Sequence, residues 1–323
     1  ATMTGHLSAR FIAAACGVSA VATLACALAP SFAGLLVARA AAGASCACII
    51  PLSMAWVGDT TPYETRQGML ARFLLEQIIG LSVGAALGEF AAASGWWQWP
   101  FVALAAWFLV VGAVLGRTAW RQPSGAHEVG GHLLANLLEV LRTPGVPRVV
   151  ATVFLEGVVL LGPLAFVATH LNQVRGAAMP VAGAMFIAVS AGGVVFAWFA
   201  RRIVPVLGES RLSAMGTAVI ALSVLGIAWI PWLGAAPLTC FGAGLGFYML
   251  HNTLQVNATQ MAPTRRGAAV ALFASLFFLG QSAGVALAGR LAEAIGTSWT
   301  LTASAMALLP VGLGFALSGA RRK

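Results

Sequence analysis

Charged residues are scarce in this chain of 323 residues. Asp, Glu, Lys and Arg together make up only 8% of the chain, whereas 60% of its residues are hydrophobic. An average soluble domain carries about 25% charged residues, so this composition is too poor in charge to cover a water-facing surface. The composition therefore excludes a soluble protein. We predict an all-α, polytopic membrane protein.

The sequence is also poor in groups for catalysis or metal binding. All five cysteines lie in apolar stretches, where they are expected to act as small apolar side chains. His127 and His132 lie in a glycine-rich stretch with a spacing that suits metal binding poorly. The string Gly80-Leu-Ser-Val-Gly84 fits the G-x-S-x-G pattern of serine hydrolases. That pattern requires a strand-to-helix turn, and here it lies inside a predicted helix. We expect no enzyme, no metal site and no cofactor.

Long apolar windows are abundant instead. A bilayer core of about 30 Å requires roughly 20 helical residues to cross it. Windows of this size, separated by Gly, Pro and Arg, predict about ten transmembrane helices. They run over about 11–29, 33–57, 68–92, 100–116, 148–169, 178–199, 212–230, 236–258, 267–288 and 299–317.

The basic residues indicate the orientation of these helices. If the spans cross alternately, all of the eighteen Lys and Arg residues except Arg39, Arg175 and Arg290 fall on one side. The positive-inside rule makes this side cytoplasmic. We therefore expect a multi-pass protein of the inner (plasma) membrane with both termini in the cytoplasm. The net charge of +9 then reflects topology, and we expect no binding to nucleic acid. The opposite connections carry tryptophans typical of an interfacial belt, namely Trp96, Trp97, Trp99, Trp229, Trp232 and Trp299.

The longest connection, residues 117–147, contains a predicted amphipathic helix. Its leucines share one face and its polar residues the other, which suits a helix on the membrane surface; the leucines are Leu133, Leu134, Leu137, Leu138 and Leu141. This linker divides the chain into an N-terminal bundle of about four helices, residues 1–116, and a C-terminal six-helix bundle, residues 148–323.

The two predicted bundles repeat one another in sequence. The segment that begins at Asp59 matches the segment that begins at Gln260, and the match pairs Pro62 with Pro263, Arg66 with Arg266, Gly80 with Gly280 and Gly84 with Gly284. Such halves are typical of a parallel repeat about an axis along the membrane normal. Because the second bundle has two more spans than the first, the repeat predicts that two helices are missing before residue 1.

Ionisable side chains inside predicted spans mark candidate functional sites. A charge in a span costs roughly 3 kcal/mol on insertion scales, so each one is a functional hypothesis. Arg39, Glu76 and Glu156 lie in spans, and the two carboxyls are at a similar depth, so either could exchange a proton. For Glu76 the alternative is an ion pair with Arg72. We expect His170, near the outer boundary, to reach water.

Glycines mark expected contacts between helices. Gly80, Gly84 and Gly88 follow one another at four-residue spacing in the third predicted span, and Gly280 and Gly284 repeat the pattern in the ninth. This spacing allows close approach of transmembrane helices. We predict that these glycines form packing surfaces, including the surface between the two halves.

These residues resemble the major facilitator superfamily, and more narrowly its proton-coupled drug and sugar efflux members, the arabinose efflux permease-like group. The stretch Gly34 to Gly43, with Arg39 at its centre, is similar to the family's fourth-helix motif, although alanine replaces its glutamine. Gly5 to Arg10 resembles the cytoplasmic loop motif, with Ala9 in place of its aspartate. Gly80 to Glu89 resembles the fifth-helix antiporter motif without its proline.

The resemblance implies a two-bundle fold in which the spans are the third to twelfth of twelve helices. It further implies that Arg39, Glu156, His251, Asn252 and Gln255 face the substrate path. The implied function is a monomeric secondary transporter in the lipid bilayer, which exports a small organic solute by alternating access and uses protons as the coupling ion. The alternative is a truncated or degenerate scaffold of the same fold that does not transport.

Overall fold

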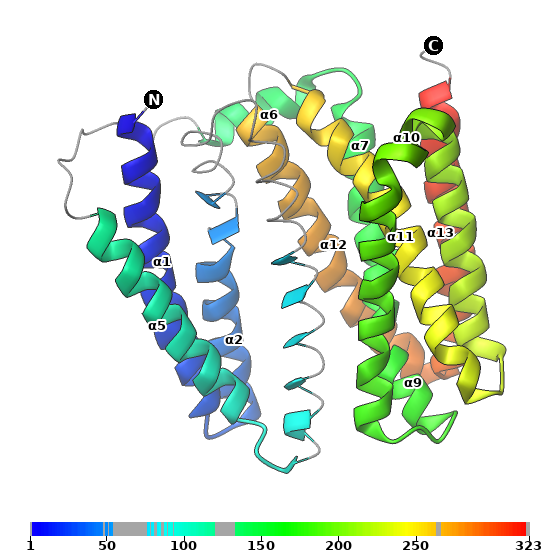
Figure 1. Cartoon of the computed structure of the whole chain (residues 1–323), viewed down its shortest axis with the longest axis horizontal. Helices are drawn as coiled ribbons and strands as arrows, with labels where there is room; N and C mark the ends of the chain where they lie inside the picture. Colours follow the sequence, from blue (N-terminus) through cyan, green and yellow to red (C-terminus); the bar gives the residue numbers. More distant parts are fainter. Residues whose placement is uncertain are drawn as a thin grey trace. The chain divides into compact units, whose positions relative to one another are not determined.

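The computed structural model describes residues 2–47, 49–50, 52–53, 76–77, 79–80, 83–84, 87–88, 90–92, 94–119, 133–262 and 266–320. The regular elements within these ranges are all helices (Figure 1), which confirms the predicted all-α class. They belong to two compact units. Unit 1 comprises residues 1–77 and 87–131, and unit 2 comprises residues 78–86 and 132–323.

Unit 1 contains three well-defined helices, α1 (Thr2–Ala27), α2 (Phe32–Cys46) and α5 (Trp99–Ala119). Ser31 begins α2 by accepting a hydrogen bond on its side chain from the backbone N–H of Gly34, at 3.1 Å, as an N-cap serine does. Small residues then allow close packing at the centre of this unit, where Ala22, Cys26, Ala38 and Ala42 are buried. The predicted span 68–92 lies mostly outside the described residues.

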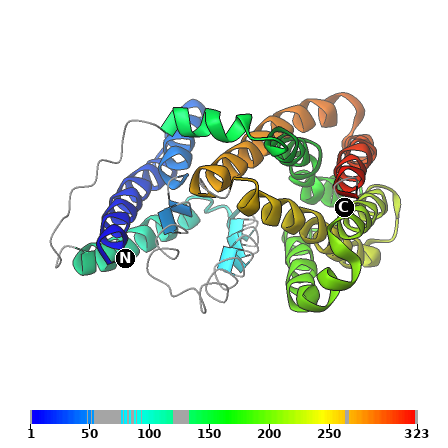
Figure 2. The same cartoon turned by 90° about the horizontal axis from the view of Figure 1, so that it is seen from above.

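Unit 2 holds the remaining helices. These are α6 (Leu133–Arg142), α7 (Val146–Glu156), the π-helix η1 (Gly157–Leu161), α8 (Gly162–Leu164), α9 (Val167–Gln173), α10 (Met179–Trp229), the 3-10 turn η2 (Leu233–Ala235), α11 (Ala236–Gln260), α12 (Arg266–Ile295) and α13 (Thr297–Ala320). Within this unit α10 lies beside α11 and α13, and α12 lies beside α7 (Figure 2). The C-terminal end of α13 lies at the same end of the unit as α6, which we call the α6 end, whereas α9 lies at the opposite α9 end (Figure 1).

The long element α10 is two helices joined at Gly208. Gly208 has φ 68° and ψ 166°, outside the helical region, and glycine adopts positive φ without a steric penalty. The sequence predicted two spans here, 178–199 and 212–230, and the break lies between them. In the part of the chain that is described, seven helices are long and apolar enough to cross a membrane, and α10 is one of them.

The surface helix α6 is oriented differently from the prediction. Val140 is its buried residue, and Leu137 and Leu141 pack beside it against a cluster that includes Val146 and Val150 of α7. Leu138 is exposed. The predicted leucine face is therefore divided, because α6 packs against the helices of its own unit along part of the face that was assigned to the membrane.

Candidate functional site

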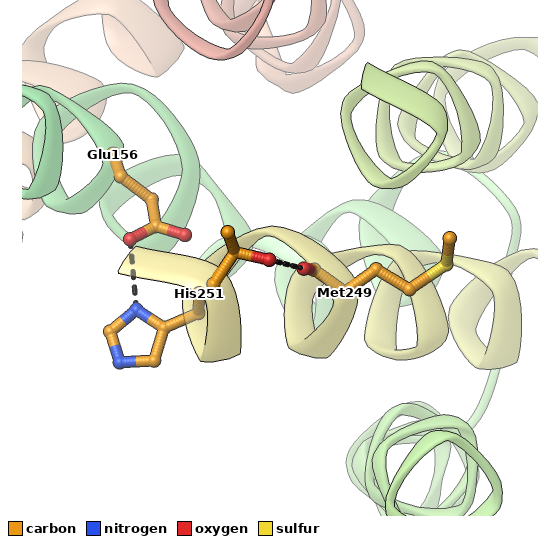
Figure 3. Close-up of polar contacts among 4 residues, drawn as sticks. Glu156, Met249 and His251 are labelled. Atoms are coloured by element: carbon orange, nitrogen blue, oxygen red, sulfur yellow. Dashed lines mark hydrogen bonds and ion pairs between the residues drawn. The ribbon is translucent and has the colours of Figure 1, made fainter. Parts of the chain in front are cut away.

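A buried carboxyl and an imidazole form the centre of the site. Glu156 is the last residue of α7, and its side chain is 0% exposed. Its Oε2 atom is hydrogen-bonded to Nδ1 of His251, on α11, at 2.9 Å (Figure 3). The other carboxyl oxygen, Oε1, is buried and has no hydrogen-bond partner within the described ranges. The pair lies wholly inside unit 2.

The local sequence explains why the helix changes form directly after Glu156. Pro163 has no N–H, so the carbonyl of Val159, four residues earlier, loses its usual helical donor. The hydroxyl of Ser304, on α13, donates to this carbonyl instead. The N–H of Gly162 bonds to the carbonyl of Gly157, which is the five-residue spacing of a π-helix. Short π-helical segments occur frequently at functional sites.

Glycines hold this segment close to α12. A Cβ atom at Gly157 would collide with the backbone at Phe277, and one at Gly162 would collide with Gly284. In the other direction, a Cβ atom at Gly280 would collide with the carbonyl of Phe154, and one at Gly284 with that of Val158. Gly280 and Gly284 therefore line the contact between α12 and the segment that carries Glu156.

Three phenyl rings surround His251, and we call Phe247, Phe273 and Phe277 the aromatic cage. The ring centroid of His251 is 5.0 Å from that of Phe247, with the planes inclined by 23°. Its distance to the centroid of Phe277 is 4.5 Å and to that of Phe273 is 5.5 Å. Phe247 is one helical turn before His251 on α11, and the other two rings are one turn apart on α12. The imidazole therefore lies between a carboxylate and aromatic rings.

The neighbouring polar residues of α11 stand apart from this pair. Asn252 and Gln255 are half-buried, and neither takes part in the hydrogen bond between Glu156 and His251. Gln255 is one helical turn beyond His251 and shares its face. The side chain of His251 itself is 14% exposed, so the site is open at the imidazole and closed at the carboxyl.

The predicted residues of unit 1 occupy other surroundings. Arg39 is exposed on α2 rather than buried, and its guanidinium carbon is 5.9 Å from the centroid of the Phe101 ring. Glu76 is exposed, and Arg72, its proposed alternative partner, lies outside the described residues. Gly5 and Arg10 lie within α1 and not in a loop. The prediction of a loop there is wrong, because the chain from Thr2 onwards continues one helix.

The predicted glycine groove of the third span has a different environment from its repeat in α12. A Cβ atom added at Gly80, Gly84 or Gly88 would meet no atom within 4 Å among the described parts of the chain. Gly280 and Gly284, in contrast, lie against backbone atoms of η1 and α7. Among the described residues, close packing is therefore found at the copy in α12.

The prediction that His170 reaches water is wrong, because its side chain is 0% exposed. Its Nε2 atom is 3.1 Å from the carbonyl oxygen of Ile227, and its Nδ1 atom is 2.9 Å from Oγ1 of Thr297. A carbonyl only accepts, so Nε2 carries the hydrogen, and in the neutral ring Nδ1 accepts from the threonine hydroxyl. The partners lie far away in sequence, which is why position alone placed His170 in water.

The fold and the buried site together define a polytopic membrane transport protein. The chain belongs to the Major Facilitator Superfamily, whose family profile matches residues 2–285. It is 24% identical over 279 residues to the uncharacterized MFS-type transporter YceJ of Bacillus subtilis (strain 168), a match that covers 84% of this chain and 69% of YceJ. The predicted superfamily is thereby confirmed.

Solved structures show the same fold. The human organic anion transporter MFSD10 (TETRAN) superposes with a TM-score of 0.71 at 20% identity, over 98% of this chain and 79% of that one. A bacterial homolog of the human lysosomal transporter Spinster, in an inward-facing and unoccupied conformation, gives a TM-score of 0.68 at 18% identity, over 99% and 86% of the two chains. The protein is therefore a membrane transporter, and members of this superfamily bind small-molecule solutes.

Proposed function

We propose that the protein is a secondary active transporter that exports a small organic solute by alternating access, in exchange for protons that bind at Glu156 and His251. The observation that carries this proposal is the carboxyl of Glu156, which is completely buried and, among the described residues, is hydrogen-bonded through one oxygen only, to an ionisable imidazole. An ionisable group at this depth in a membrane helix is costly and marks a proton or solute pathway.

The proton count of the pair determines its net charge. With one shared proton, Glu156 and His251 are neutral overall, either as an ion pair or as a carboxylic acid beside a neutral imidazole. Loss of this proton leaves an uncompensated negative charge in a buried position, which is strongly unfavourable. Proton release therefore needs either water at the site or a second positive group. This requirement supports a link between proton occupancy and the conformational cycle.

The orientation in the membrane and the roles of the other candidate residues follow the same mechanism. The α6 end of unit 2 is cytoplasmic in the inner membrane, both termini of the chain are cytoplasmic as the positive-inside rule predicts, and the protein acts as a monomer. Arg39 and Glu76 contribute to coupling in the other half of the transporter. Asn252 and Gln255 line the solute path beside His251, and the packed glycines of α12 hold the segment that carries Glu156 close to that helix.

Transport from reconstituted vesicles tests this function. Proteoliposomes would be loaded with a mixture of small organic solutes and placed in more acidic buffer, and the released solutes would be identified by mass spectrometry. We expect at least one solute to leave faster than from protein-free vesicles, and a protonophore to abolish the difference. Glu156→Gln should lose this response to the gradient. Glu293→Gln, which alters an exposed carboxyl of α12, is the matched control.

Each other outcome counts against a defined part of the proposal. Export that persists in Glu156→Gln with the same dependence on the proton gradient removes Glu156 from the coupling mechanism. Wild-type protein that releases no solute above the protein-free vesicles supports the alternative of a non-transporting membrane protein with this fold.

A further inference from the structure

We propose that the aromatic cage and Glu156 form a binding site for a planar organic monocation, which displaces His251 and exchanges for one proton. This inference rests on the proposed function and adds the chemical class of the solute. Its starting point is the geometry of His251, whose ring is stacked on Phe247 at 5.0 Å and is 2.9 Å from Glu156. Those are the surroundings that a flat cation requires.

The cage and the carboxyl both favour positive charge. The faces of phenyl rings carry negative electrostatic potential and attract cations within about 6 Å of the ring centroid. The three centroids lie 4.5 Å, 5.0 Å and 5.5 Å from that of the imidazole. The ring of His251 is stacked on Phe247 and is tilted by 41° and 47° against the rings of Phe277 and Phe273. A cation in its place would therefore lie near three aromatic rings and the carboxylate of Glu156. An anion there would meet the charge of Glu156 directly.

The charged residues of the helices around the pair lead to the same conclusion. Neither α11 nor α13 contains an Asp, Glu, Lys or Arg residue, and α12 carries its charged residues near its two ends, at Arg266, Arg290 and Glu293. The helix α10, which packs against α11, carries its charged residues around the turn at Gly208, where Glu209 accepts a hydrogen bond from Asn257 of α11. On α7, Arg148 is two helical turns before Glu156, and its guanidinium lies over the ring of Phe315 at 6.0 Å. Tyr248, on α11, is neutral. Glu156 is thus the acidic group at the centre of this packing, and His251 is the basic group beside it.

The unpartnered oxygen of Glu156 points to a ligand independently. Oε1 is buried and accepts no hydrogen bond from the described residues, although a buried carboxylate oxygen is normally satisfied. His251 is hydrogen-bonded to Oε2 and not to Oε1, and its side chain is 14% exposed. Outward rotation of the imidazole would free the position that it occupies beside Phe247. A planar cation in that position would stack on Phe247 and meet Glu156 with its edge.

The charges balance in this exchange. Before binding, Glu156 and His251 share one proton, and the site is neutral. When the cation enters, this proton leaves to water, Glu156 remains as carboxylate and the imidazole is neutral. The positive charge of the ligand replaces that of the proton, so the site avoids a net buried charge in both states. One cation therefore exchanges for one proton.

A set of three ligands that share one shape and differ in charge tests the site. N-methyl-4-phenylpyridinium is cationic, 4-phenylpyridine is neutral above about pH 7, and biphenyl-4-carboxylate is anionic. Binding to the purified full chain would be measured by equilibrium dialysis between about pH 7 and pH 9, together with the change in pH of a weakly buffered solution. We expect the cation alone to bind, to release about one proton per molecule, and to bind up to about tenfold more tightly for each pH unit upwards.

Variants identify the groups responsible. Glu156→Gln should abolish binding of the cation, whereas Glu156→Asp, which keeps the charge, should bind it more weakly. Phe277→Leu should weaken binding about 5- to 30-fold, the effect of one desolvated cation–π contact. Phe199→Leu, which changes an exposed ring of α10, should leave binding unchanged. Size-exclusion profiles and circular dichroism show whether each variant is folded.

Several results would overturn the inference. These are binding of biphenyl-4-carboxylate in preference to the cation, binding without proton release, and equal binding by wild type and folded Glu156→Gln. The two proposals can also fail separately. Gradient-driven export of a solute without any binding of the cation would leave the proposed function standing and refute the cation site. Binding of the cation with proton release, but without export of any solute, would support the cation site and refute the proposed transport function.

Discussion

The hydroxyl of Ser304 on α13 donates a hydrogen bond to the carbonyl of Val159, the acceptor that Pro163 leaves without its helical N–H. This bond joins α13 to the π-helix that follows Glu156. It also means that the proline and the serine compensate one another, although they are far apart in the chain. The two side chains should therefore show strong energetic coupling.

We expect Ser304→Ala to lower the free energy of unfolding by about 1–3 kcal/mol, because it leaves the partly buried carbonyl of Val159 unsatisfied. The same substitution in a Pro163→Ala background should cost much less, because alanine supplies a backbone N–H at position 163. A double-mutant cycle, measured by chemical unfolding in detergent, tests this coupling. Additive effects of the two substitutions would contradict it.

The close contact of α12 with η1 predicts different effects at different glycines. Gly280→Ala should destabilise the protein by about 1–3 kcal/mol, because its Cβ would press on the carbonyl of Phe154 and adjacent helices would have to separate. Gly314→Ala, on α13, is the control, because its Cβ meets no described atom within 4 Å and alanine favours helix. Unfolding followed by tryptophan fluorescence should show a lower midpoint for the first variant and an equal or higher midpoint for the second.

His170 and Arg175 stabilise the C-terminal end of α10. The last carbonyls of a helix have no helical donors. His170 bonds to the carbonyl of Ile227 at 3.1 Å, and Nη2 of Arg175 donates to that of Ala228 at 2.6 Å. We expect His170→Ala to destabilise the protein by about 1–3 kcal/mol, since it leaves both Ile227 and the Thr297 hydroxyl without their partner. Thermal unfolding of His170→Ala and Arg175→Ala would measure this. An unchanged midpoint for His170→Ala would exclude a stabilising role for the buried imidazole.

Chemical labelling tests the orientation of unit 2. Ala178→Cys introduces an exposed thiol at the α9 end, immediately before α10, and Arg202→Cys introduces one towards the α6 end of the same element. If the α6 end is cytoplasmic, a membrane-impermeant maleimide added to intact cells should label the first variant and reach the second only after the membrane is opened. The reverse pattern would invert the topology. The unsubstituted chain provides the background of its own cysteines, of which Cys16, Cys26 and Cys240 are buried.

The sequence was sufficient to locate most of the helices, because apolar length alone decides which segments can cross a bilayer. The predicted spans coincide with described helices except for 68–92, which is mostly outside the described residues, and for the second half of 33–57, where α2 ends at Cys46 and several later residues lie outside the described ranges. Glu156 could be selected for the same reason, since a carboxyl inside an apolar segment is costly. Its hydrogen bond to His251 could not be predicted, because it depends on the packing of α7 against α11.

The predictions that failed depended on packing or on helix ends. His170 was assigned to water from its position near the end of a span, but residues of α10 and α13 enclose it. The stretch from Gly5 to Arg10 was assigned to a loop, although it contains no proline and continues as helix α1. Neither composition nor spacing contains this information.

The turn at Gly208 has a mechanical consequence. It joins the two halves of α10 with one non-helical residue, so the connection has almost no slack. Any tilt of the first half pulls directly on the second, and the second half is anchored at its far end by the side chains of His170 and Arg175. The two spans are therefore joined directly at the α6 end of unit 2, without a flexible loop that could absorb a displacement of one relative to the other.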